Sequence, residues 1–338
     1  MLITGWFFRN DLHGITRAGY FLKRYIYFAG MIKKIMTVFF LLASGATCFS
    51  QATDTTVQIG NRSITLSEVV VNNKLNIPTF IERIKNDTSF YKAFRNLRVL
   101  GFTAINDIRI NNSDGKTKAS LHSKTKQVRI NNCRKMETLE EQVTGDIYDE
   151  YRNFNYYTAQ MYASLFFTRD SVCGEDNIVT GREFSTGGKS GMEKRKEQLK
   201  MLFFNPGKRI NGLPFMSSKT AIYDDAMADK YDMSIDMTIY NNTSCYVFTQ
   251  KVRPESKDGV VIDEMTTWFD DKDFEVVARN YSLSYDAAVY DFKVQMQVVM
   301  TKFGDYRVPS LIRYIGNWKA IFKPRERGVF TATLFDFN

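Results

Sequence analysis

The chain has 338 residues, enough for one large domain or two small ones, and its 44% hydrophobic and 14% aromatic content can fill a packed core. The net charge of +9 is concentrated at the start, because the first fifty residues hold six Lys/Arg and one acid. The remainder carries 40 bases and 36 acids. That balance argues against the dominant basic surface of a nucleic-acid-binding protein, so we expect no nucleic-acid partner.

Residues 31–50 have the pattern of an export signal. Lys33 and Lys34 form its charged start, a mostly apolar run follows, and small residues lead to an expected cleavage point at Ser50–Gln51. The apolar run is too short to span a bilayer, which favours a signal that is removed over a retained membrane helix.

Residues 1–30 fit no signal peptide, so we expect Met31 to be the true start and 1–30 to be translated upstream sequence. A lipoprotein modified at Cys48 is the less favoured alternative, because Gly45 and Thr47 fit poorly as the residues before a lipid-modified cysteine. We therefore expect an exported protein of the periplasm or one associated with the outer membrane.

Few residues are suited to metal binding, redox chemistry or catalysis. Signal removal leaves three cysteines, Cys133, Cys173 and Cys245, which allow at most one disulfide and leave its pairing open. The only histidines are His13 and His122, too few for a histidine metal site or a convincing catalytic triad. We expect no catalytic site, metal or cofactor, and hence a protein that is not an enzyme.

The region 51–98 predicts one strand and two helices. Its strand is the β-branched run 64–71. Pro78 opens the first helix at the position that proline tolerates best, and residues 87–89 can cap the second.

The region 99–338 predicts an antiparallel domain with two inserted helices, at about 147–167 and 191–204. It begins with a hairpin at 99–130, whose basic charge the acid-rich residues 136–150 can cancel. The later strands are expected at 219–224, 231–240, 245–252, 260–269, 274–285, 289–301, 306–318 and 328–337.

The predicted strands alternate apolar and polar residues, most clearly at 231–239 and 290–300. Successive strand side chains point to opposite faces, so each strand has one apolar face that another layer must cover. A spacing of 12–15 residues between strands favours an α+β antiparallel meander over parallel βαβ units.

The C-terminal strands share a set of features: Thr267-Trp268-Phe269, residues 274–279, the strand 290–300, Val308-Pro309 and residues 314–318. With these, residues 261–337 resemble the ending of LolA-like half-barrel proteins, the lipoprotein-carrier superfamily. Upstream segments are similar to uncharacterised exported proteins of Bacteroidota: 64–71, 80–84, 205–208 and 246–248. The resemblance implies a curved antiparallel β-meander, a half-barrel, with helices packed on a concave face able to hold acyl chains.

Two functional hypotheses follow. The first is a cell-envelope protein that binds an apolar ligand such as a lipid or a lipoprotein acyl chain, with peripheral membrane association allowed. The expected cavity wall is Tyr231, Met233, Ile235, Phe292, Val294, Met296, Val298 and Tyr314. The second is a structural or interaction module of the envelope with a filled core and no ligand. The ligand, partner proteins and oligomeric state are left open.

Overall fold

The structure is a computed structural model, and it describes residues 56–59, 62–65, 77–179, 200–210, 216–286, 290–320 and 324–338. The chain divides into two compact units, Met1–Glu68 and Val69–Asn338. The expected start at Met31 and the signal at 31–50 lie outside the described residues.

The first unit contains a two-stranded antiparallel hairpin of β1 (Thr56–Ile59) and β2 (Arg62–Thr65). The predicted strand 64–71 begins within β2, and the rest of it lies outside the described residues.

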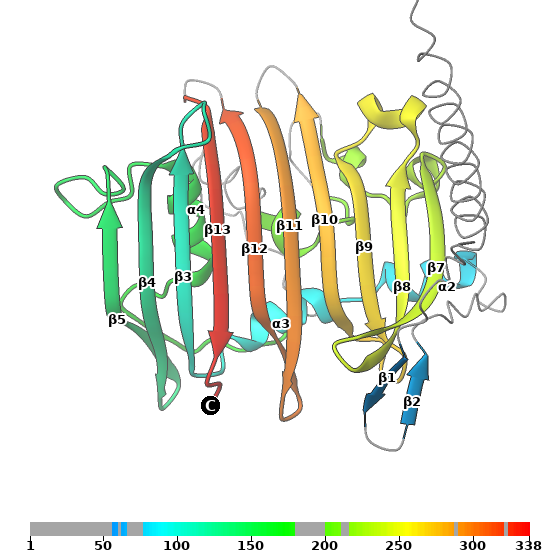
Figure 1. Cartoon of the computed structure of the whole chain (residues 1–338), viewed down its shortest axis with the longest axis horizontal. Coiled ribbons are helices and arrows are strands. Elements are labelled where there is room, and N and C mark those ends of the chain that lie inside the picture. Colours follow the sequence, from blue (N-terminus) through cyan, green and yellow to red (C-terminus); the bar gives the residue numbers. More distant parts are fainter. Residues whose placement is uncertain are drawn as a thin grey trace, which may run out of the picture. The chain divides into compact units, whose positions relative to one another are not determined.

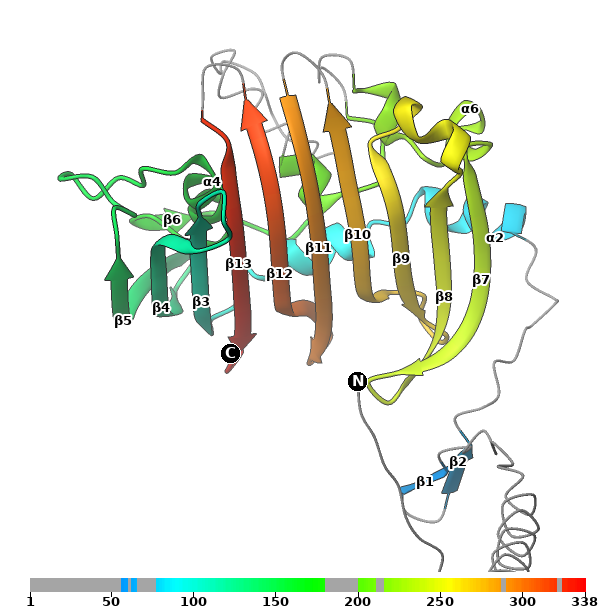
Figure 2. The same ribbon diagram turned by 45° about the horizontal axis from the view of Figure 1, so that its top comes forward.

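The second unit is built on one curved, unclosed sheet of 11 antiparallel strands, ordered β6-β5-β4-β3-β13-β12-β11-β10-β9-β8-β7 (Figures 1 and 2). The strands are β3 (Phe102–Asn111), β4 (Thr117–Ile130), β5 (Cys133–Thr144), β6 (Ser171–Cys173), β7 (Tyr231–Tyr240), β8 (Thr243–Val252), β9 (Ile262–Asp270), β10 (Val276–Asp286), β11 (Tyr290–Phe303), β12 (Tyr306–Ala320) and β13 (Glu326–Phe335). Helices lie on its concave face, so the predicted α+β half-barrel architecture is confirmed.

The strands from β7 to β13 form a continuous meander, and the chain's last strand then pairs with β3 (Figure 1). This pairing makes β13 a central strand and joins the N-terminal hairpin β3–β4 to the C-terminal meander. The predictions of these strands and of the hairpin are confirmed within a few residues.

In the second unit, one predicted strand is wrong, and two strands were not predicted. Residues 219–224 form no strand: the first two belong to a short 3₁₀ turn, η1 (Ser218–Thr220), and the rest lead to α6 (Asp225–Ala228). β6 is the edge strand and pairs only with residues 133–135 of β5, so most of β5 is also an open edge. The side chains of both are mostly exposed, so neither shows the apolar alternation of a half-buried strand. The register of β4 and β5 does place basic against acidic residues, as in the Lys124–Glu140 ion pair.

Three helices and a helical stretch lie against the sheet: α2 (Ile77–Lys85), α3 (Ser89–Asn96), α4 (Tyr157–Phe166) and residues 200–204. Pro78 is in the first turn of α2, as predicted. The side chain of Asp87 accepts a hydrogen bond from the backbone N–H of Ser89 at the start of α3 (3.1 Å). No helix among the described residues is long and apolar enough to cross a membrane.

The helix predicted at 147–167 is shorter in the structure and begins at Tyr157. Asp149 instead forms a turn, because its Oδ1 accepts backbone hydrogen bonds from Tyr151 (2.9 Å) and Asn153 (2.7 Å). α4 then starts where the carboxylate of Glu326, on β13, accepts hydrogen bonds from the backbone N–H groups of Tyr157 and Thr158 (both 2.8 Å). A carboxylate at a helix N-terminus satisfies free N–H groups and complements the helix dipole. The predicted helix 191–204 is described only at 200–204.

Candidate functional site

An apolar cavity of about 40 Å³ lies between the concave face of β10–β12 and two helical segments, α4 and residues 200–204. We call these two segments the helical cover. The cavity is lined by Met161, Leu202, Phe203, Tyr281, Leu283, Phe292, Val294, Met296, Tyr314 and Trp318. The strand residues among them alternate with polar residues on the opposite face, which is the pattern that predicts an apolar wall.

The structure brings together part of the predicted wall. The predicted residues that line the cavity are Phe292, Val294, Met296 and Tyr314. Val298 is fully buried but does not border it. The predicted residues on the edge strand β7 lie elsewhere in the sheet: Tyr231, Met233 and Ile235. A role in ligand binding stays a prediction for all eight.

Two polar atoms of the cavity wall have no hydrogen-bond partner among the described residues: the hydroxyl of Tyr314 and Nε1 of Trp318. Both residues are buried, with 2% and 7% of their surface exposed. Burial raises the pKa of Tyr314, and the nearby charge of Glu326 adds to this effect, so its hydroxyl stays a neutral donor. An unpaired buried donor costs about 1–3 kcal/mol.

A third hydroxyl ties the helical cover to the sheet. Tyr281, on β10, donates a hydrogen bond to the backbone carbonyl of Phe203 (2.7 Å). The cavity-facing side chains of the cover, Met161, Leu202 and Phe203, are apolar. Contact between cover and sheet at this cavity therefore depends mainly on packing.

Two glycines shape the sheet beneath α4. Gly316 on β12 pairs with Gly328 on β13. A Cβ at Gly316 would collide with the hydroxyl of Tyr314, and one at Gly328 would approach Cγ2 of Thr158 to 2.5 Å. The absence of side chains thus lets the Tyr314 ring lie over Gly316 and lets the first turn of α4 approach the strands. The same ring stacks on Phe330, with centroids 4.5 Å apart.

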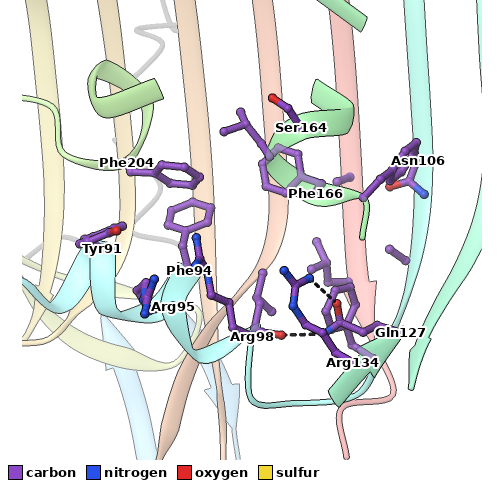
Figure 3. Close-up of a pocket in the computed structure, with 17 residues that line it drawn as sticks. Tyr91, Phe94, Arg95, Arg98, Asn106, Gln127, Arg134, Ser164, Phe166 and Phe204 are labelled. Carbon is purple, nitrogen blue, oxygen red and sulfur yellow. Dashed lines mark hydrogen bonds between the residues drawn. The ribbon is translucent and has the colours of Figure 1, made fainter. Parts of the chain in front are cut away.

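A second pocket, of about 100 Å³, lies between α3, α4 and strands β3 to β5 and β13 (Figure 3). We call it the arginine pocket, because Arg95, Arg98 and Arg134 reach it from α3, the residue stretch after α3, and β5. Much of the remaining lining is apolar: Phe94, Leu97, Phe102, Ala104, Leu165, Phe166, Phe167, Phe204, Ala332 and Leu334. The pocket therefore combines cationic and apolar walls.

The three guanidinium groups are held by two consecutive acids, Glu175 and Asp176. Glu175 accepts from Arg98 (2.8 Å) and from Nε of Arg134. Asp176 accepts from Nη2 of Arg95 through its carboxylate (3.1 Å) and its backbone carbonyl (2.8 Å).

A disulfide bond lies directly before the two acidic residues in the chain. Cys133 on β5 and Cys173 on β6 form a disulfide, and Cys245 is a free, buried thiol. The pairing that the sequence left open is thus Cys133–Cys173. It fixes the chain two residues before Glu175 to the strand that carries Arg134.

Burial and mutual repulsion set the electrostatics of the arginine pocket. Burial lowers the pKa of Arg98, and the charge of Arg95 lowers it further. Burial alone would raise the pKa of Glu175, but its hydrogen bond to Arg134 and the charges of the three arginines lower it on balance. Glu175 is therefore ionised at neutral pH.

Polar residues beside the arginine pocket are hydrogen-bonded to one another on the concave face of β3 and β4. Tyr162, on α4, donates to Oδ1 of Asn106 (2.6 Å), whose Nδ2 donates to Thr125 (3.1 Å) and Ser123 (3.3 Å). Nε2 of Gln127 donates to the carbonyls of residues 97 and 100 (both 2.7 Å).

The described residues contain no group of His, Cys, Asp or Glu arranged to hold a metal ion. His122 is more than half exposed and lies 3.7 Å from a carboxylate oxygen of Asp107 on the neighbouring strand. The prediction that the chain is not an enzyme remains a prediction.

No protein-family model matches the sequence, and no curated protein matches it. Among solved structures, the chain is similar to an outer membrane lipoprotein-sorting protein domain from Vibrio parahaemolyticus, with 8% identity, a TM-score of 0.26, and coverage of 76% of this chain and 92% of that one. It is similar to a DUF1329 family protein from Desulfovibrio piger, with 10% identity, a TM-score of 0.23, and coverage of 73% and 92%. It is also similar to a LolA superfamily protein from Nitrosomonas europaea, with 9% identity, a TM-score of 0.21, and coverage of 74% and 91%. Because these scores are low, the functional proposals below are based on the contacts of this chain alone.

Proposed function

We propose that the protein binds an apolar chain, such as the acyl chain of a lipid or lipoprotein, between the sheet and the helical cover. The observation that carries this proposal is the pair of buried donors on Tyr314 and Trp318, which face an otherwise apolar cavity and have no acceptor among the described residues. Buried polar groups are normally paired, so a core completed without a ligand would be expected to satisfy or exclude both. An ester oxygen attached to an acyl chain supplies an acceptor for them.

The size of the cavity sets a condition on binding. A volume of about 40 Å³ is little more than the roughly 30 Å³ that one water molecule occupies in the liquid. An acyl chain therefore requires residues 200–204 of the helical cover to move away from β10–β12, because α4 is held by its hydrogen bonds to Glu326 and Asn106. Leu202 and Phe203 are the side chains that it would displace, and the Tyr281 hydrogen bond to Phe203 is the polar contact that must yield.

A location in the cell envelope is part of the proposal. The Cys133–Cys173 disulfide supports it, because structural disulfides persist in oxidising compartments such as the bacterial periplasm. The export signal expected at 31–50 supports the same location. Peripheral association with a membrane would place the protein near a source of acyl chains.

A series of linear alcohols from hexanol to dodecanol tests apolar binding. If the cover opens, each added methylene contributes about 0.8 kcal/mol, or about fourfold in affinity, measured by titration calorimetry. Met296→Phe enlarges a cavity-lining side chain and should weaken binding at least about tenfold. The matched variant Met233→Phe, on edge strand β7 away from the cavity, should bind like the unmodified protein.

The alternative proposal is a structural module of the envelope with a filled core. The small cavity and the near-complete burial of its strand residues favour it, since Phe292, Val294, Met296 and Tyr314 are each 9% exposed or less. It predicts that alcohol affinity does not rise with chain length. It also predicts that mass spectrometry of an organic extract of the native protein finds no co-purifying lipid. Those two results together would contradict apolar-chain binding.

A further inference from the structure

The arginine pocket holds more positive than negative charge. Among the described residues, three guanidinium groups meet the carboxylates of Glu175 and Asp176, so one positive charge is left over. Arg95 pairs with Asp176, whereas Arg98 and Arg134 share Glu175, and Arg95 is the most buried of the three, with 8% of its side chain exposed. Surplus positive charge among buried groups is costly, so such a place favours an anion.

One donor in the pocket is also unused. Nε of Arg95 is buried and has no hydrogen-bond partner among the described residues. Arg95 lines the pocket, and Gln127 and Arg134 lie across from it (Figure 3). A volume of about 100 Å³ equals that of about three water molecules, which is enough room for a carboxylate or a phosphate group.

The arginine pocket and the apolar cavity are separated by an aromatic partition of Phe94, Phe166, Phe203 and Phe204. Phe203 lines the cavity, whereas the other three line the arginine pocket. The rings are in contact, with centroids 5.7 Å apart for Phe166–Phe203 and 4.9 Å for Phe94–Phe204. Displacing Phe203 for an acyl chain would therefore join the two spaces.

We propose that the arginine pocket binds the oxyanion of an amphiphile, a carboxylate or phosphate on the end of the chain that enters the apolar cavity. This inference rests on the proposed function and specifies its ligand class as an anionic amphiphile. The anion accepts a hydrogen bond from Arg95 and neutralises the remaining charge, while the aromatic partition receives the first carbons of the chain. Glu175 and Asp176 keep the arginines oriented when no ligand is bound.

Dodecanoate and dodecanol provide the test, because they share a chain and differ in charge. We expect dodecanoate to bind the full-length protein at least about tenfold more tightly than dodecanol, with a preference that weakens at high salt. Acetate and inorganic phosphate, which lack a chain, should bind far more weakly than dodecanoate. Titration calorimetry at neutral pH measures all four.

Single substitutions test whether the arginine pocket causes the preference for dodecanoate over dodecanol. Arg95→Gln should reduce dodecanoate affinity to that of dodecanol and leave dodecanol affinity unchanged, while Arg95→Lys should retain part of the preference. Arg109→Gln, exposed on β3 and not part of the pocket lining, makes the same change in net charge and should have no effect. Thermal melting checks that each variant folds. If Arg95→Gln does not fold, Arg98→Gln, whose side chain is about one-third exposed, decides by the same comparison.

Each outcome separates the two proposals. Equal affinities for dodecanoate and dodecanol overturn the oxyanion site and leave the apolar-chain proposal standing. Phosphate or acetate binding as tightly as dodecanoate, and depending on Arg95, shows a site for a free anion and overturns the amphiphile. Binding of neither twelve-carbon compound overturns the apolar-chain proposal and this inference with it.

Discussion

The concave face of the sheet has two halves that are stabilised in different ways. In the apolar half, β9–β12 and residues 200–204 meet mainly through hydrocarbon and ring contacts, as at Phe203 and Met296. In the polar half, Asn106 on β3 bonds α4 through Tyr162, and Gln127 on β4 bonds the chain that follows α3. Directional bonds require one arrangement, whereas apolar contacts tolerate rearrangement of similar side chains. The polar half can therefore hold the fold in place while the apolar half opens.

The largest expected effect tests how the edge of the polar half is held. The Cys133–Cys173 disulfide spans 40 residues, and the chain-entropy model assigns about 4 kcal/mol to a loop of that length. We expect the Cys133→Ser, Cys173→Ser double variant to lose up to about this much unfolding free energy in urea titrations. Hydrogen exchange should accelerate in β5 and β6 while β10–β12 stay protected. The variant and the unmodified protein are compared at urea concentrations equally far below their unfolding midpoints.

A control separates the disulfide from the mere loss of a thiol. Cys245→Ser removes a buried thiol that forms no disulfide and lies on β8. If it accelerates exchange in β5 and β6 as much as the double variant does, the disulfide does not hold that edge.

Phe203→Ala tests the apolar half. Truncating a buried phenylalanine costs about 3–5 kcal/mol, and we expect the lower end, because Phe203 already borders a cavity and so loses fewer contacts. The same change enlarges the cavity, so dodecanol affinity should rise although stability falls. Phe303→Ala, at a residue that is 37% exposed, is the matched control and should change both quantities little. A fall in dodecanol affinity in Phe203→Ala would count against an opening cover.

The strands of the apolar half were predictable from the sequence because each one alternates apolar and polar residues over most of its length. The same alternation correctly placed Phe292 and Met296 on one buried face. Edge strand β5 could not be found in this way, since most of its side chains are exposed and it has no apolar face to reveal it. The start of α4 depends on Glu326, which lies 169 residues from Tyr157, so no local pattern contains it.

The arginine pocket was not predicted, for a related reason. Arg95 lies in α3 and Arg98 lies two residues beyond its end, and no local pattern marks either of them as part of a pocket. Their acidic partners come from about 80 residues later in the chain, as Arg95–Asp176 has a separation of 81. The sequence contains one partial signal for the pocket: the adjacent acids at 175–176 follow directly after Cys173-Gly174. The disulfide then determines where these acids lie, and its pairing was open.

Asn106→Ala tests the polar half. Asn106 accepts from Tyr162 and donates toward Ser123 and Thr125, and its removal leaves the Tyr162 hydroxyl without this acceptor. We expect a loss of about 2 kcal/mol in unfolding free energy, from the desolvation cost of unpaired buried groups. Asn280→Ala, on the exposed face of β10, should change stability little. Equal losses in the two variants would mean that the buried network does not distinguish the halves.

The smallest effect is a pH dependence confined to the polar half. The lowered pKa of Glu175 means that its ionised form stabilises the folded state, because the unfolded chain binds the proton more readily. This contribution is present above the ordinary carboxyl pKa of 4.5 and is lost as the pH falls through the lowered value in the folded protein. Glu175→Gln should therefore flatten the decline in unfolding free energy below pH 4.5 and reduce stability at neutral pH.

Glu137→Gln, on the exposed edge strand β5, makes the same chemical change away from the arginine pocket and should leave the pH profile as it is. If both variants shift the profile equally, the acid sensitivity belongs to general surface charge. If Glu175→Gln alone flattens it, Arg98 and Arg134 depend on this carboxylate when the pocket is empty, and added dodecanoate should then stabilise Glu175→Gln more than the unmodified protein.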